Sequence, residues 1–407
     1  MVGGNRYFLA AQQAADALGV TRATLYAYAS RGQLRSEAVP GRPKERRYYR
    51  EDVEHLRERK EARRDPARAA ARGLHWGGPV LESAITLIHG GQFYYRGHDA
   101  VTLAKTSTLE AIASLLWGVS ARESERLFQQ PSSLPRRHVA SLRSFGTDRL
   151  SMVQAALPIV GALDVASYDL SPGTVQRTGA RIMRLVSNII AGHDSAAPVH
   201  LSLQEKWAPR KPAVADVIRT ALVLCADHEL NVSAFTARCA ASAGASPYQV
   251  VAAALATFRG YKHGGAAERV LALLAEMDTA RDARGLVANH LRRGERVPGV
   301  GHRLYPAGDP RAVELLRCAE ASGNHREWQR VRGLLRASSD LLHDLPNLDF
   351  GLAAVTRVYA LPDEAPALLF ALGRTVGWIA HAMEEYASGD LIRPRARYIG
   401  PAPQTRS

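Results

Sequence analysis

The groups best suited to chemistry in this chain lie in short polar segments that interrupt apolar stretches. The segment 261–266 carries His263 before two glycines, and the segment 298–305 carries His302 in a similar glycine-rich loop. Glycine lets a ligand approach the backbone closely, and the helix expected after His263 favours negative charge at its N-terminus. A histidine in such a place tends to stay neutral, so it can donate a hydrogen bond to a developing enolate oxygen.

A further segment, 346–350, offers a candidate base. Asp349 stands between Asn347 and Phe350 at the expected edge between a loop and a helix. An aspartate that apolar neighbours partly desolvate is a better base than a free one. The alternative is structural, because an aspartate at this place could simply cap the helix that follows.

Three arginines in the same half of the chain, Arg311, Arg374 and Arg393, can clamp carboxylates, because a guanidinium binds a carboxylate bidentately. Two histidines, one aspartate and several arginines suit carbon–carbon bond formation between an activated methyl group and a polycarboxylate ketone. Taken singly, each residue is as well explained by structure. The arginines could be surface charges, and most of the 14 histidines must be structural or exposed.

The elements that must position these groups are mostly helical. Residues 84–88 and 92–95 flank Gly90-Gly91 and predict a β-hairpin. Strand–helix–strand alternation is not evident, so the main body is predicted to be all-α. Apolar periodicity and capping residues predict helices at 111–117, 121–129, 151–165, 174–192, 212–227, 230–242, 247–258, 266–276, 280–293, 311–322, 325–340, 350–359 and 363–388.

Residues 1–61 predict a separate winged helix-turn-helix unit. Its expected parts are helices at 10–18 and 22–29, a basic hairpin at 39–49 and a third helix at 51–61. The second helix can present Arg22 and Thr24 to base edges in the major groove of DNA. The candidate phosphate contacts are the basic residues of the hairpin, Arg42, Lys44, Arg46 and Arg47. The same scaffold also serves as a docking module for proteins, so both uses stay open.

The composition is that of a globular protein with more than one domain. The 407 residues are 46% hydrophobic and 23% charged, and residues 62–79 are expected to form a linker. An apolar run of about 18 residues, which a membrane span needs, and a secretory signal are both absent from the sequence. Residues 1–72 hold 16 basic and 9 acidic side chains, so 16 − 9 = +7 of the net charge of +14 lies there. Such an excess suits polyanions, or simply a solvated basic surface.

Cysteine and histidine spacing gives no sign of a metal. The three cysteines are far apart and odd in number, which argues against a disulfide framework or a cysteine zinc site and favours the reducing cytoplasm. A site built from His228, His263 and His302 is conceivable, but the close spacing typical of metal ligands is missing. We therefore expect neither a metal nor a redox cofactor.

Taken together, the segments resemble the citrate synthase family over about residues 84–400. The shared motifs are His-Gly-Gly-Ala at 263–266, Gly-x-Gly-His-Arg-x-Tyr with Asp-Pro-Arg at 299–311, Asn-x-Asp-Phe at 347–350 and Arg-Thr-Val-Gly-Trp-Ile-Ala-His at 374–381. The resemblance implies a citrate synthase fold over residues 80–400, with a small helical domain at about 231–345 and a large domain formed by the remainder. Residues 19–26 and 46–53 likewise resemble the winged helix-turn-helix of MerR-type and excisionase-type proteins.

The resemblance also implies a role for each matching residue. Asp349 matches the base that removes a proton from the acyl-CoA α-carbon, His263 the group that stabilises the enol, and His302 the group that polarises the oxaloacetate carbonyl. Ser233 matches a hydroxyl that orients the first of these histidines. The substrate-binding matches are His228, Arg311, Arg374 and, from the partner subunit of a homodimer, Arg393. The expected CoA contacts are Arg296, Gly299, Val300 and Gly301.

The function expected from the resemblance is condensation of acetyl-CoA with oxaloacetate to give citrate and CoA. One alternative is 2-methylcitrate synthase, which uses propionyl-CoA and shares these motifs. Another is a DNA-binding regulator whose enzyme fold senses a metabolite, and a third is an enzyme whose N-terminal unit docks a protein. Family members often carry Asn where this chain has Ala267, and the loop after Tyr305 is not basic. These departures bear on CoA affinity and on substrate choice.

Overall fold

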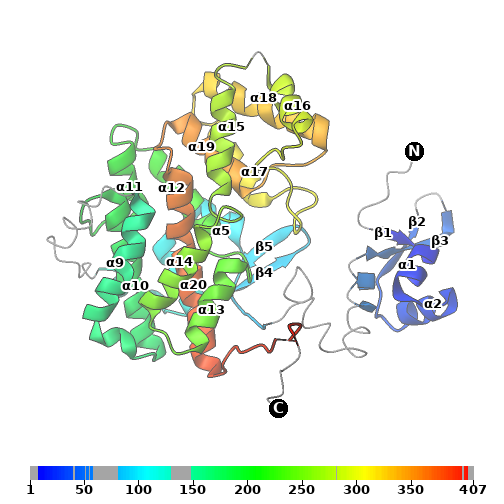
Figure 1. Cartoon of the computed structure of the whole chain (residues 1–407), viewed down its shortest axis with the longest axis horizontal. Helices are drawn as coiled ribbons and strands as arrows, with labels where there is room; N and C mark the ends of the chain where they lie inside the picture. Colours follow the sequence, from blue (N-terminus) through cyan, green and yellow to red (C-terminus); the bar gives the residue numbers. More distant parts are fainter. Residues whose placement is uncertain are drawn as a thin grey trace. The chain divides into compact units, whose positions relative to one another are not determined.

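The structure is a computed structural model, and its chain divides into two compact units, residues 1–82 and 83–407 (Figure 1). The residues that the structure describes are 8–39, 42–50, 52–54, 56–57, 81–129, 148–280, 282–396 and 398–401, without the side chains of residues 42–44 and 121. The expected linker, 62–79, lies outside them.

The N-terminal unit is a helix-turn-helix with a β-hairpin wing, as the sequence predicts. Its elements are β1 (Phe8–Ala10), α1 (Ala11–Leu18), α2 (Arg22–Ser30), β2 (Ser36–Val39) and β3 (Arg42–Tyr49). Gly19 ends α1 at φ +61°, in the left-handed region that favours glycine, and the Thr21 side chain caps α2. The sequence did not predict that β1 pairs with β3 to make a three-stranded sheet.

The small core of this unit joins the helices to the wing. Leu18 of α1, Leu25 of α2 and Tyr48 of β3 are buried in one cluster. Of the expected third helix, residues 52–54 and 56–57 are helical, and the rest lies outside the described residues.

Among its described residues the larger unit is helical apart from one small sheet, in agreement with the all-α prediction. The sheet has the order β4 (Thr86–His89), β5 (Gln92–Tyr95), β6 (His98–Asp99), and its first two strands are the predicted hairpin. The helices are α5 (Ala100–Thr106), α6 (Leu109–Trp117), α7 (Ala121–Phe128), α9 (Arg149–Leu163), the 3-10 helix η1 (Val165–Tyr168), α10 (Pro172–Ala191), α11 (Val199–Trp207), α12 (Val214–Cys225), α13 (Val232–Ser242), α14 (Pro247–Phe258), α15 (Ala266–Glu276), α16 (Ala283–Arg292), α17 (Pro310–Glu320), α18 (His325–Leu342), α19 (Leu348–Tyr359) and α20 (Ala365–Ser388).

Helix α20 is the central element of this unit. It is buried along most of its length and packs against α6, α10, α12, α13, α14 and α19. A helix that is apolar nearly all round is typical of such a central position. Gly377 lets α20 approach the segment after α12, because a Cβ there would lie 2.4 Å from Ala226 O and from Asp227 Oδ1. The Gly377 amide instead donates to Ala226 O at 3.0 Å, and this hydrogen bond fixes the position of α20 along its axis relative to that segment.

Helices α15 to α19 form a second group, in the upper part of the larger unit in Figure 1. Within it α17 packs on α19, α15 on α19 and α16 on α18. Helices α13 and α14 pack on α20, and α14 also packs on α9, so they belong with the helices around α20. The packing therefore changes after α14, and the expected division into a small domain at about 231–345 and a large domain stays a prediction. None of the described helices is long and apolar enough to span a bilayer.

Candidate active site

The segment between α12 and α13 places His228 at the centre of a cluster of rings. His228 is buried, and its Nε2 lies 2.8 Å from the Tyr305 hydroxyl. The ring of His302 stands edge-on to it, with centroids 5.4 Å apart. Burial, followed by the positive charges of Arg311 and Arg374, holds the pKa of His228 well below its usual range. The imidazole is therefore neutral at physiological pH.

His302 has a defined tautomer. Its Nδ1 accepts a hydrogen bond from the Leu304 amide at 3.2 Å, so in the neutral ring the proton is on Nε2. Burial and the positive charge of Arg311 lower the pKa of His302 to about 4. The site thus holds a neutral N–H donor at this position.

His263 lies in the turn between α14 and α15, and its Nε2 is 3.0 Å from the Ser233 hydroxyl. Burial and the charge of Arg374 lower the pKa of His263 to about 4, so this imidazole is neutral as well. A Cβ on Gly264 would lie 2.4 Å from the Phe258 ring, so the glycine after His263 is needed for packing. The helix expected after the two glycines begins at Ala266.

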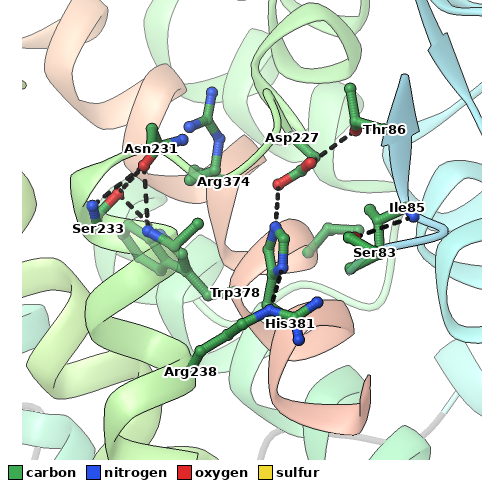
Figure 2. Close-up of polar contacts among 12 residues, drawn as sticks. Ser83, Ile85, Thr86, Asp227, Asn231, Ser233, Arg238, Arg374, Trp378 and His381 are labelled. Atoms are coloured by element: carbon green, nitrogen blue, oxygen red, sulfur yellow. Dashed lines mark hydrogen bonds and ion pairs between the residues drawn. The ribbon is translucent and has the colours of Figure 1, made fainter. Parts of the chain in front are cut away.

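The Ser233 hydroxyl has three polar neighbours, His263, Asn231 and Trp378, and the last two are labelled in Figure 2. It accepts from Trp378 Nε1 at 3.1 Å and lies 2.8 Å from Asn231 Oδ1. Asn231 is also the cap of α13, since the same oxygen accepts from the amides of Ser233 and Ala234. A hydroxyl has one proton, so Ser233 donates either to Asn231 or to His263 Nε2. Only the second choice leaves the proton of neutral His263 on Nδ1.

Asp349 is the second residue of α19 and does not cap that helix. The cap is Asn347, whose Oδ1 accepts from the amides of Asp349 and Phe350. The capping alternative for Asp349 is therefore wrong. One carboxylate oxygen of Asp349 is buried with no hydrogen-bond partner, and burial raises the pKa of this carboxyl to about 7 although Arg311 acts to lower it.

Backbone hydrogen bonds tie the loop of His302 to the segment of Asp349. The Asn347 amide donates to Gly299 O at 2.9 Å, and the Gly301 amide donates to Leu345 O at 2.8 Å. Gly299 has φ +80°, and a Cβ there would lie 2.6 Å from Val270. Val300 forms a β-bridge with Pro346. The glycines expected to contact CoA therefore also hold the two segments in register.

Two of the three expected carboxylate clamps are buried beside these groups, so the surface-charge alternative is wrong for both. Arg311 is 3% exposed and makes a bidentate ion pair with Asp309, with contacts of 2.9 and 2.8 Å. Arg374 is 1% exposed and donates from Nε to Cys225 O at 2.8 Å. Its Nη2 is buried without a hydrogen-bond partner.

The structure does not bring two expected binding residues into this cluster. Arg393 is exposed in the segment that follows α20, and Arg296 is exposed just before the loop of Gly299. Among the residues that the structure describes, no group of three His, Cys, Asp or Glu side chains is arranged to hold a metal ion.

Two arginines of the wing, Arg46 and Arg47, have partners within the N-terminal unit. Arg46 donates to the hydroxyl and the carbonyl of Ser36, at 2.9 Å each. Arg47 pairs with Glu37 and lies over the Phe8 ring at 4.0 Å.

On helix α2, Arg22 donates to the Tyr26 hydroxyl at 2.9 Å, and Thr24 Oγ1 lies 3.0 Å from the hydroxyl of the capping threonine, Thr21. Arg42 and Lys44 belong to β3, but their side chains lie outside the described residues.

Several groups that shape the site were not singled out from the sequence. Tyr305 and Asp309 stood inside the 299–311 motif without a role, and Asn231 stands three residues after His228. The nearness of all three to a candidate histidine in the sequence was the only signal. Trp378 and His381 stood inside the 374–381 motif in the same way. Their contacts join segments more than 140 residues apart, for example Trp378 with Ser233 at a separation of 145.

Comparison with known proteins supports the same assignment. Residues 73–395 match the family described as "Citrate synthase, C-terminal domain", and residues 8–61 match "Helix-turn-helix domain". The chain is 29% identical to citrate synthase 2 of Bacillus subtilis (strain 168) over 365 residues, which cover 82% of this chain and 97% of that protein. It is 30% identical to the citrate/2-methylcitrate synthase of the same strain over 344 residues, 78% of this chain and 92% of that protein.

A solved structure is similar over nearly its whole length. It is the citrate synthase of the archaeon Thermoplasma acidophilum in a ternary complex with carboxymethyl coenzyme A and oxaloacetate. The TM-score is 0.72 at 25% sequence identity, over 83% of this chain and 98% of that one. The chain therefore belongs to the citrate synthase family of condensing acyltransferases, and it carries a helix-turn-helix domain before the citrate synthase fold.

Proposed function

We propose that this enzyme condenses acetyl-CoA with oxaloacetate and releases citrate and CoA. One observation carries the proposal. A carboxylate with an unpartnered oxygen and a pKa of about 7, that of Asp349, lies in the same site as two imidazoles that stay neutral, those of His263 and His302. A base that is half ionised near neutral pH, together with neutral N–H donors, suits enolisation of a thioester.

In the proposed first step the Asp349 carboxylate takes a proton from the methyl group of the acyl thioester. The electron pair moves into the carbonyl, and the enol oxygen receives a hydrogen bond from Nδ1–H of His263. Ser233 makes this possible when its proton points to His263 Nε2, because the ring then carries its own proton on Nδ1. The neutral ring stabilises the enol without the cost of a buried imidazolium.

In the second step the enol carbon attacks the ketone carbon of oxaloacetate. Nε2–H of His302 polarises the ketone oxygen and gives it the proton of the new hydroxyl. The ring regains a proton from the water that attacks the new thioester, and protonated Asp349 returns its proton to the departing CoA sulfur. His228 and the buried guanidiniums of Arg311 and Arg374 would bind the oxo-acid and its carboxylates. Water then hydrolyses the new thioester, which releases CoA and makes the condensation irreversible.

The remaining assignments concern CoA and the second subunit. We place CoA along the loop of Gly299, Val300 and Gly301, with Arg296 near a CoA phosphate. Arg393 would reach the active site of the other subunit in a homodimer, which suits its exposed position after α20. Closure of the α15–α19 group over the substrates would bring these parts together and exclude water.

The experiment that tests the reaction is CoA release with oxaloacetate, using acetyl-CoA and propionyl-CoA in parallel and a thiol reagent as the reporter. Faster release with acetyl-CoA supports the proposal. Faster release with propionyl-CoA favours 2-methylcitrate synthesis, which a relative at 30% identity with the name citrate/2-methylcitrate synthase makes a specific second candidate. No release with either thioester from folded protein would contradict both.

DNA binding is a further candidate function, and the match of residues 8–61 to a helix-turn-helix domain favours it. The test is fluorescence anisotropy of duplex DNA at several salt concentrations, with and without oxaloacetate. Arg22→Ala and Arg31→Ala remove the same charge from opposite ends of α2. Only the first should weaken binding strongly if the start of α2 enters the major groove. Equal losses of DNA affinity in the two variants would indicate only non-specific attraction between charges. If the wild-type protein does not bind DNA at all, protein docking becomes the proposed use of this unit.

A further inference from the structure

A buried row of polar side chains runs beneath the candidate site, from the small sheet across to α13 (Figure 2). Asp227, the residue before His228, is fully buried. Its Oδ2 accepts from the Thr86 hydroxyl at 2.6 Å, and its Oδ1 lies 3.3 Å from His381 Nε2. On the other side of the ring, Arg238 Nε donates to His381 Nδ1 at 3.1 Å.

The partners of His381 define its protonation. A guanidinium can only donate, so His381 Nδ1 must be an unprotonated acceptor. The ring is therefore neutral, and its one proton is on Nε2, facing the Asp227 carboxylate. Arg238 is itself anchored by ion pairs with Glu384 and Glu385 of α20. The row thus gives one oxygen of Asp227 a hydrogen bond from Thr86 and places the Nε2 of His381 beside the other, at 3.3 Å and without hydrogen-bond geometry.

Asp227 is also the counter-charge of a buried arginine that it does not pair with. Burial lowers the pKa of Arg374, and Asp227 is the acidic group that opposes this most. Among the described residues the structure gives Arg374 no ion pair, and its Nη2 has no hydrogen-bond partner. In Figure 2 the guanidinium lies beside Asn231, while the Asp227 carboxylate turns toward Thr86 and His381.

The contrast with Arg311 shows what the row achieves. Arg311 and Asp309, in the same site, form the bidentate ion pair that a buried guanidinium and a nearby carboxylate normally adopt. Asp227 does not do this with Arg374, because its Oδ2 accepts from Thr86 and its Oδ1 faces His381 Nε2 at 3.3 Å. We infer that His381, with Thr86, is a positioning residue that holds Asp227 away from Arg374 and so keeps Arg374 Nη2 available for a substrate carboxylate.

This inference rests on the proposed function, in which Arg374 binds the oxo-acid. Removal of the His381 proton should let Asp227 turn to Arg374, whose Nη2 has no hydrogen-bond partner and on which the Asp227 charge already acts. The substrate would then compete with an internal carboxylate. The expected signature is a rise in KM for oxaloacetate of about tenfold, equivalent to about 1.4 kcal/mol, with KM for the acyl-CoA within about twofold of wild type. A general loss of structure would change both KM values and kcat together.

The test compares His381→Phe, which keeps a ring without polar atoms, with His381→Gln, whose amide can still donate toward Asp227 and accept from Arg238. The first should show the selective KM change and the second should restore most of the wild-type value. His200→Phe, at a buried histidine of α11, is the matched control and should leave both KM values unchanged. Unchanged oxaloacetate KM in folded His381→Phe, or equal changes in both KM values, would overturn the inference.

Thr86→Val carries the test if His381→Phe does not fold, because it removes the donor to the other oxygen of Asp227. It should raise KM for oxaloacetate about threefold or more, and Thr375→Val, whose hydroxyl bonds only within α20 to Ala371 O, should not. An unchanged KM in Thr86→Val would then refute the role of the row.

Calorimetric titration of oxaloacetate without a thioester separates this inference from the proposed function. Wild-type protein that binds oxaloacetate but releases no CoA would refute the proposed reaction. The row could still be tested, because the variants should bind oxaloacetate more weakly than wild type. Wild-type protein that does not bind oxaloacetate would overturn both.

Discussion

Replacement of Asp349 by Asn should make the protein more stable at neutral and alkaline pH, although it removes a negative charge from the first turn of α19. A carboxylate near a helix N-terminus is ordinarily favoured by about 0.3–1 kcal/mol. Here burial dominates, and it raises the pKa of Asp349 from 3.8 to about 7. The folded protein therefore pays to ionise this group at the pH where it works as a base.

The size of the effect follows from that shift. A change of about three pKa units corresponds to about 4 kcal/mol, and the partial exposure of the side chain to water reduces this to about 2 kcal/mol. The folded state holds the proton to a higher pH than the unfolded chain does. Stability is therefore lost as pH rises from about 4 to about 7, and the loss is complete above that range.

Thermal unfolding of wild type and Asp349→Asn from pH 4 to pH 9 measures this directly. The two proteins should unfold at nearly the same temperature at the acid end, and the variant should gain a few degrees by about pH 8. Asp363→Asn, at an exposed residue just before α20, is the control and should show no such trend. A variant that gains nothing at pH 8, or gains equally at every pH, would show that Asp349 ionises like an ordinary surface carboxylate and would refute the reasoning.

Three further predictions concern the reaction and the wing. The logarithm of kcat/KM for the acyl-CoA should rise with a slope of about one below pH 7 and level off above it, because Asp349 of the free enzyme must be ionised while both histidines are already neutral. A flat profile between pH 5.5 and 9 would contradict this. Ser233→Ala should lower kcat about tenfold with little change in KM for oxaloacetate, and steady-state kinetics showing normal kcat would remove Ser233 from the mechanism. Arg47→Ala should make the N-terminal unit less stable and raise its rate of proteolysis without affecting CoA release, because Arg47 pairs with Glu37 and lies over the Phe8 ring. An unchanged rate of proteolysis would show that these contacts contribute little to stability.

Local patterns predicted most of the helices. The helix predicted at 174–192 is α10, Pro172–Ala191, because its apolar positions keep the helical period and Gly192 ends it in the left-handed conformation. Helix α11 was missed because Val199, Leu201 and Leu203 alternate with polar residues, a pattern typical of a strand. Tertiary packing decides whether such a segment forms a helix or a strand, and the packing cannot be read from a single sequence.

The candidate site was likewise predicted only in part. Types and spacing of residues picked out Asp349 and the histidines, because each lies in a short motif with glycine or asparagine beside it. The sequence could not reveal that Asn347 rather than Asp349 caps α19, since both have the right chemistry within three residues. Nor could it reveal the row from Thr86 to Arg238, because His381 and Arg238 are 143 residues apart and meet only after α13 has packed on α20.

The most direct test of the account is CoA release by Asp349→Ala, measured with oxaloacetate and whichever thioester the wild-type enzyme prefers, alongside calorimetry of oxaloacetate binding. The rate of CoA release should fall by at least about a thousandfold while oxaloacetate binds with nearly wild-type affinity, because only the base has been removed. Release close to the wild-type rate from the folded variant would mean that Asp349 is not the base, and the mechanism proposed for this site would be wrong.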